Sequence, residues 1–189
     1  LVNGVSGADT ITLFDAAKFR TKFACEVKNF DPTEYVDRKE ARKMDRFTQL
    51  AIAASDQAIS DAGLNKDNID PDRSGVVLGS GIGGLTTFQN VVIDFARGDG
   101  TPRFNPFFIP KMILDIAPGH VSMRHNLRGP NFSTVSACAS STHAIGVALD
   151  LLRLGKADIM VTGGSEAVIS EAGVGGFNAM KAMSERNDD

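Results

Sequence analysis

The stretch Asn131-Phe-Ser-Thr-Val-Ser-Ala-Cys138-Ala-Ser-Ser-Thr-His143-Ala-Ile-Gly-Val-Ala-Leu-Asp-Leu-Leu-Arg-Leu154 joins a β-prone run to a helical one. Residues 132–135 predict a strand, and an apolar helical pattern starts directly after Cys138 and stops at Gly155. A second apolar run, residues 158–162, predicts another strand. This order indicates a βαβ unit. Because the helix is apolar nearly all round, we expect it to be buried on more than one face.

Cys138 lies at the junction of the expected strand and helix. Thiolate is the nucleophilic form of cysteine, and unpaired N–H groups at a helix N-terminus stabilise negative charge there. The neighbours are small enough to admit a substrate carbonyl: Ala137, Ala139, Ser140 and Ser141. A nucleophile and a small buried core cysteine both fit this placement.

Composition sets broad limits. The 189 residues carry a net charge of −3 and are 42% hydrophobic, which fits one globular domain with a sizeable core. The negative charge argues against nucleic acid as the main partner. Two cysteines do not make a disulfide scaffold, so we expect a reducing, cytoplasmic compartment and a structural role for Cys25. No apolar run approaches membrane-spanning length, and no motif predicts a metal or organic cofactor, so we expect neither membrane insertion nor a cofactor. Both ends of the chain look cut.

Residues 37–62 predict the clearest helix, with Asp37 and Glu40 as a capping box and Gly63 as its stop. Its first turns gather four cations: Arg38, Lys39, Arg42 and Lys43. Cations at a helix N-terminus oppose the helix dipole, so helix stability does not explain them. A solvated polar face is the plain interpretation.

A buried strand is expected over residues 73–78, entering the run Gly79-Ser-Gly-Ile-Gly-Gly84. This run matches the G-x-G-x-x-G dinucleotide fingerprint, but no acidic ribose ligand clearly follows at the usual distance. Close backbone packing is therefore favoured over a nucleotide site. A helix is expected over residues 85–96, and the Pro- and Phe-rich residues 102–110 are expected to be irregular but stiff.

The run Thr134-Val-Ser-Ala-Cys138-Ala-Ser-Ser141, with Gly129-Pro130 before it, resembles the active-site signature of β-ketoacyl-acyl-carrier-protein synthases. The resemblance extends to residues 38–45, 79–84, 106–110 and 173–177. It covers essentially all of this chain, residues 1–189, but only about the first half of the family's chain. It implies an α/β, thiolase-like fold with a mixed sheet layered by helices, as the N-terminal half of a five-layer αβαβα sandwich. It also implies a homodimer.

The same resemblance implies a fatty-acid-elongating acyltransferase that uses Cys138 as its nucleophile. An acyl chain held on Cys138 would condense with malonyl-acyl carrier protein, losing carbon dioxide, to give a 3-oxoacyl product. The implied acyl-binding residues are Ile82, Phe108, Ala137, Gly173 and Phe177. The implied carrier-protein docking residues are Arg38, Lys39, Arg42, Lys43 and Arg103. Phe177 fits a plain core position equally well.

Two alternatives stay open: a polyketide-type ketosynthase, and a non-catalytic piece or partner subunit. His120 and His125 have no predictable approach to the thiol, and His143 lies five positions after Cys138, on a different helix face. The resemblance places the assisting histidines and lysine beyond Asp189. We therefore expect the 189-residue chain to be inactive alone.

Overall fold

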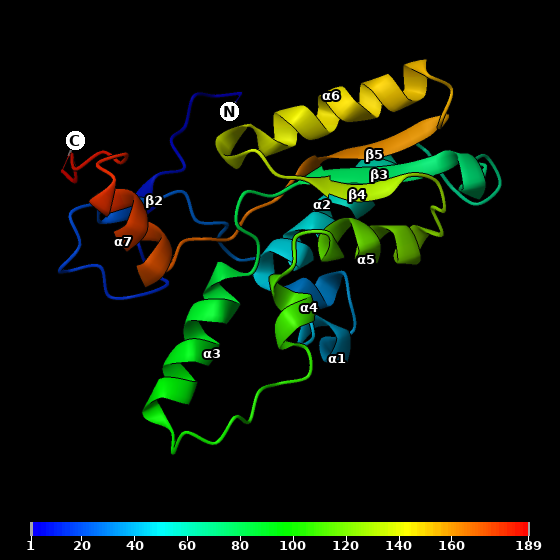
Figure 1. The fold of residues 1–189 in the computed structure, drawn as a ribbon. Helices are drawn as coiled ribbons and strands as arrows, with labels where there is room; N and C mark the ends of the chain where they lie inside the picture. The colour runs from blue at the N-terminus through cyan, green and yellow to red at the C-terminus, as the bar shows by residue number, and fades with distance from the viewer. Residues whose placement is uncertain (1, 189) are drawn as a thin grey trace. The chain divides into compact units, whose positions relative to one another are not determined.

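The computed structural model describes residues 2–188 and divides them into two compact units. One unit runs from Pro32 to Ala167, and the other combines the chain up to Asp31 with the chain from Val168 onwards. Both units appear as ribbons in Figure 1.

A parallel sheet forms the centre of the larger unit, in the order β4-β3-β5. Its strands are β3 (Ser74–Gly79), β4 (Asn131–Thr134) and β5 (Ile159–Gly164). Gly79 pairs with Thr134 on one side and with Gly164 on the other, so all three strands end at the same edge. β3 is buried along its whole length, as expected for a central strand covered on both faces. All strand pairs in this three-stranded sheet are parallel.

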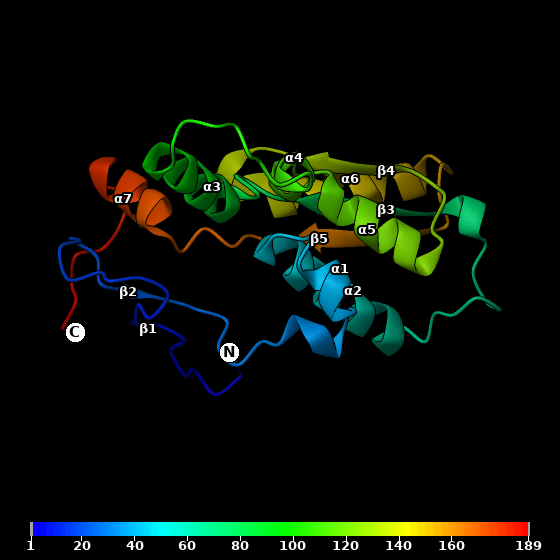
Figure 2. The same ribbon diagram turned by 90° about the horizontal axis from the view of Figure 1, so that it is seen from below.

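Helices cover both faces of this sheet (Figures 1 and 2). On one face lies α6 (Ser140–Arg153), and on the other lie α2 (Arg46–Asp61) and α5 (Ile116–His125). The remaining elements of the unit are η1 (Pro32–Glu34), α1 (Arg38–Ala41), η2 (Pro71–Arg73), α3 (Leu85–Arg97), α4 (Phe108–Met112) and η3 (Ala137–Ala139). The chain passes from β4 through α6 to β5, which confirms the βαβ unit predicted around Cys138.

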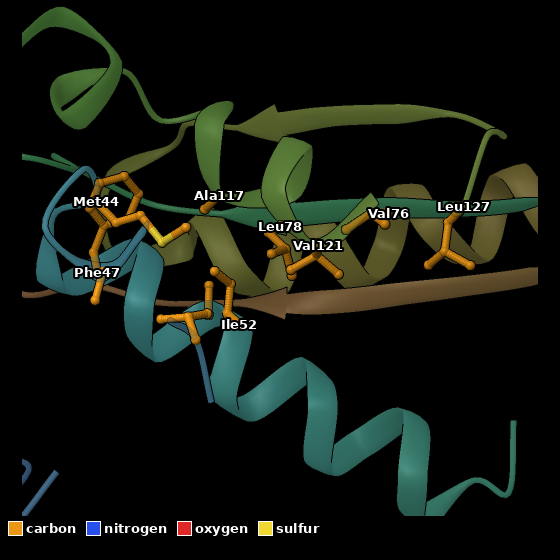
Figure 3. Close-up of a cluster of buried hydrophobic side chains, with 11 residues drawn as sticks. Met44, Phe47, Ile52, Val76, Leu78, Ala117, Val121 and Leu127 are labelled. Atoms are coloured by element: carbon orange, nitrogen blue, oxygen red, sulfur yellow. The ribbon is translucent and has the colours of Figure 1, made fainter. Parts of the chain in front are cut away.

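The main hydrophobic core lies between the sheet, α2 and α5 (Figure 3). Phe47 and Ile52 of α2 meet Val76 of β3 and Val121 of α5, and three of these four side chains have no solvent exposure. Burying such side chains contributes roughly 1.5–3 kcal/mol each. The core therefore fixes β3, and with it the glycine-rich segment that follows.

The smaller unit contains the antiparallel pair β1 (Asp9–Thr10) and β2 (Phe23–Ala24), together with α7 (Glu171–Ala179). Ile11, Ala16 and Val174 form its apolar core. Asn178 donates a hydrogen bond from Nδ2 to Thr21 Oγ1 at 2.8 Å, and both residues are buried. This bond ties α7 to the N-terminal segment within the unit.

Two expectations about helices were wrong. The single helix over residues 37–62 is divided, because Asp45 caps a new helix by accepting from the Phe47 N–H at 3.2 Å. Asp45 Oδ2 also accepts from the Thr87 hydroxyl at 2.5 Å, a contact far away in sequence. The segment of residues 102–110, expected to be irregular, ends in α4, which tolerates Pro110 within its first turn.

Burial of α6 also differs from expectation. Ala144 and Ala148 face the sheet and are buried, whereas Ile145 is 53% and Leu149 44% exposed within residues 2–188. The helix is thus apolar on two faces but covered on one. Its open face is an unpartnered apolar surface in this chain.

Candidate active site

Cys138 lies on a tight turn at the edge where the three parallel strands end. β4 ends at Thr134, Ala137 adopts φ = 51°, and α6 begins at Ser140. A positive φ is unusual for a residue with a side chain and marks a constrained backbone. This turn leaves Cys138 exposed rather than buried, so the alternative of a buried core cysteine was wrong.

Ser140 holds the turn together from within. Its buried hydroxyl accepts from the Ser136 N–H at 2.9 Å and donates to the Ala137 carbonyl at 2.7 Å. The Thr134 hydroxyl donates to the Ser140 carbonyl at 2.8 Å. These bonds tie the residues before Cys138 to Ser140 at the start of α6, which stabilises the strained Ala137 conformation.

Two glycines allow α6 to approach the sheet closely. A Cβ on Gly79 would fall on the backbone of Ser140 and Ser141, and one on Gly164 would fall on the Ser141 side chain. The close-packing interpretation of the glycine-rich run is therefore confirmed. Only residues without a side chain fit beneath the turn that carries Cys138.

Glu166, which the sequence reasoning missed, fills the loop after β3. Its carboxylate accepts from the backbone N–H groups of Gly81 at 2.6 Å, Ile82 at 2.9 Å and Gly83 at 2.9 Å, and from the Ser80 hydroxyl at 3.1 Å. These amides are the groups that a nucleotide phosphate would need. A protein carboxylate occupies them instead. The sequence did contain a signal for this contact, because Glu166 is an acidic residue that closely follows the expected strand of residues 158–162 and its two glycines.

The expected acyl-binding residues fall in both units. Ile82 lies on the glycine-rich loop and is 39% exposed, and Ala137 lies in the cysteine turn. Phe108, at the start of α4, stacks on Phe88 and Phe104 with ring centroids 6.4 and 5.6 Å away. Gly173 and Phe177 lie on α7 in the smaller unit, where Gly173 is buried against Val168. The larger unit thus holds Cys138, Ile82, Ala137 and Phe108.

The three histidines have distinct surroundings. His143 Nδ1 lies 2.6 Å from Ser136 Oγ, two residues before Cys138. His125 Nε2 lies 2.8 Å from Asp56 Oδ1. Burial lowers the pKa of His120 below its ordinary value. His143 therefore contacts the cysteine turn through Ser136. The spacing of His143 from Cys138 along the helix did not predict this contact.

The basic residues expected at a docking surface lie on and just after α1. Arg38, Lys39 and Arg42 are exposed, and no carboxylate among residues 2–188 forms an ion pair with them. Lys43 is more constrained, since its Nζ lies 2.6 Å from Glu40 Oε1 and 5.4 Å from the centre of the Phe107 ring. Arg103, between α3 and α4, forms an exposed ion pair with Asp99 at 3.8 Å.

Comparison with known proteins identifies the family to which this sequence belongs. The sequence matches the family described as beta-ketoacyl synthase, N-terminal domain, over residues 2–189. The chain belongs to this beta-ketoacyl synthase family. The chain is 44% identical to 3-oxoacyl-acyl-carrier-protein synthase 2 of Staphylococcus aureus, over 99% of this chain and 45% of that protein. It is 43% identical to the protein of the same name from Synechocystis, over 100% of this chain and 45% of that protein.

A solved structure supports the fold class. The ishigamide ketosynthase/chain length factor superposes with a TM-score of 0.82 at 29% identity, covering 96% of this chain and 45% of that one. The thiolase-like α/β fold expected from the sequence is therefore confirmed. The chain spans about half the length of the curated relatives it matches. No helix among residues 2–188 is long and apolar enough to cross a membrane.

Proposed function

We propose that this chain is the nucleophile-bearing part of a 3-oxoacyl-acyl-carrier-protein synthase that elongates fatty acids. One observation carries the proposal: Cys138 is exposed on a strained turn that is fixed by Ser140, at the edge where three parallel strands end. Active sites of parallel α/β sheets form at this edge. The relatives at 44% and 43% identity carry the name of this activity.

The proposed reaction has two steps on Cys138. Its thiolate attacks the carbonyl carbon of an acyl-carrier thioester, and the carrier thiol leaves, so the acyl chain becomes bound to the cysteine. The malonyl group on a second carrier then loses carbon dioxide, and the electron pair of the broken C–C bond attacks the bound acyl carbonyl. The cysteine thiolate leaves, and the 3-oxoacyl product is two carbons longer. The covalent intermediate splits one difficult transfer into two easier ones.

This chain's own groups supply part of that chemistry. Backbone N–H groups at the cysteine turn are proposed to stabilise the oxyanion. Ile82, Phe108 and Ala137, all in the larger unit, are proposed to contact the acyl chain. No cofactor is required for these steps.

The experiment for this function is a condensation assay on the intact protein that contains this chain. With acyl- and malonyl-carrier protein, we expect equimolar carbon dioxide and 3-oxoacyl-carrier protein. The 189-residue chain alone is expected to give none, because His120 and His125 lie on α5, His125 bonds to Asp56, and His143 bonds to Ser136. A polyketide-type ketosynthase is the alternative, and it would be recognised if saturated acyl chains failed to load onto Cys138.

We propose that the basic residues on and just after α1 (Arg38, Lys39, Arg42 and Lys43), with Arg103, dock the carrier protein. Arg38, Lys39 and Arg42 are exposed and form no ion pair within residues 2–188, so they are free to meet an acidic surface. Reversing Arg38 and Arg42 to glutamate is expected to weaken carrier binding by about tenfold at low salt and by less at high salt, as exposed charges are screened.

The matched control reverses Lys66 and Lys156, two exposed cations away from α1. Calorimetric titration with the carrier protein at two salt concentrations measures both variants. Equal losses in the two variants would show that only net charge matters, and that α1 is simply a solvated face.

We further propose that the intact protein is a cytoplasmic homodimer. An apolar surface on α3, α4 and the segment between them supports self-association: Phe88, Val92, Phe95, Phe104 and Ile109 are each between 41% and 56% exposed. A monomeric soluble protein rarely leaves so many large apolar side chains open together. Sedimentation equilibrium of the intact protein tests this, and a monomer at micromolar concentration would refute it.

A further inference from the structure

The glycine-rich loop after β3 is held in place by one side chain from outside it. Glu166 lies two residues beyond the end of β5, and β5 is the parallel neighbour of β3. Its two carboxylate oxygens accept from three consecutive backbone N–H groups, those of Gly81, Ile82 and Gly83. Consecutive amides that converge in this way form a concavity for an anion. In this loop the anion is the carboxylate of Glu166.

This loop lies against the turn that carries the nucleophile. A Cβ on Gly81 would stand 3.4 Å from the Ala137 carbonyl oxygen, so the loop and the residue before Cys138 are in close contact. Further along, the Gly84 N–H donates to the Met112 carbonyl at 3.3 Å. Gly83 has φ = +71°, which permits the bend between these two contacts. The position of Ile82 is therefore set between the cysteine turn and the end of α4.

The chemistry of the contact requires a carboxylate. Three N–H groups and a hydroxyl donate to it, so every partner of Glu166 supplied by the loop is a donor. Hydrogen bonds to an ionised acceptor are about twice as strong as neutral ones. A glutamine would present an NH₂ group to at least one of these N–H groups, which pairs donor with donor and loses the bond.

We propose that Glu166 is a positioning residue that fixes the Ile82 loop and thereby sets acyl-chain-length discrimination at Cys138. This rests on the proposed function, in which Ile82 contacts the acyl chain. Glu166 does not need to touch the substrate. It acts by holding the backbone on both sides of Ile82, so that the Ile82 side chain keeps one position against the acyl chain.

The test uses Glu166→Gln in the intact protein, with Glu34→Gln on the exposed η1 segment as the matched control. Amide hydrogen exchange is measured first, because it does not depend on activity. We expect exchange at Gly81, Ile82 and Gly83 to accelerate by about tenfold or more, since a charged hydrogen bond is lost. Exchange at Val76 and Val77 in β3 should stay unchanged, which shows that the variant is folded. Glu166→Asp keeps the charge on a shorter side chain and should restore part of the protection.

Acylation of Cys138 is then compared between butyryl and lauroyl thioesters. In Glu166→Gln, we expect the preference for one thioester over the other, measured as the ratio of the two acylation rates, to fall by about fivefold. A mobile Ile82 side chain discriminates less between chain lengths. Alkylation by iodoacetamide, which needs no acyl pocket, should remain within about twofold of the unmodified protein. An unchanged rate ratio, or unchanged exchange in the loop, overturns the proposal. Failure of the unmodified protein to acylate with either thioester would instead overturn the proposed function and this proposal with it.

Discussion

Replacing Cys138 by alanine is expected to reduce condensation by the intact protein by on the order of 10³-fold or more, because the covalent route disappears with the nucleophile. Cys138 is exposed on a turn in which Ser136 and Ala137 are bonded to Ser140, so the substitution removes one sulfur without removing any of those bonds. Stability should therefore change little. Loss of activity in a folded variant would locate the chemistry in the thiol itself.

The second cysteine provides the control. Cys25 is also exposed, but it lies just after β2 in the smaller unit, with no following helix. Cys25→Ala should keep the activity of the unmodified protein. Mass spectrometry after brief treatment with an acyl thioester should find the acyl group on Cys138. Acylation of Cys25 instead, or full activity of Cys138→Ala, would reverse the assignment.

Local patterns predicted the elements around the site well. The strand, turn and helix around Cys138 were predictable, because alternation of apolar residues and the run of small residues are local signals. The close approach at Gly79 was predictable for the same reason, since only glycine fits where two backbones meet. The βαβ order then determined that Cys138 lies at the edge where the strands end.

Contacts between distant parts of the sequence were not predictable in this way. Asp45 bonds to Thr87 and divides the first long helix, and nothing near Asp45 in the sequence signals that partner. Glu166 reaches the Gly81 N–H across 85 positions, which is visible only once β3 and β5 are known to be neighbours. The exposure of Ile145 was missed because periodicity shows which faces are apolar and not whether a second layer covers them.

Replacing Gly79 by alanine is expected to destabilise the protein strongly. The added Cβ would meet the backbone of Ser140 and Ser141, and backbone atoms at a helix start cannot rotate away as a flexible side chain can. Gly79 is also the last residue of the buried central strand, so it cannot move outwards. Overpacking of this kind costs about 3 kcal/mol, at the upper end of its usual range.

The matched control is Gly119→Ala in α5, where an added Cβ would have no neighbour within 4 Å. Alanine is favoured over glycine inside a helix by roughly 0.5–1 kcal/mol, so this variant should be neutral or slightly more stable. Urea unfolding measures both variants. Displacing Ser140 should also release its bonds to Ser136 and Ala137, so the alkylation rate of Cys138 should change in Gly79→Ala alone. Equal unfolding midpoints for the two variants would mean that α6 can shift along the sheet, and that the glycine does not determine where the nucleophile stands.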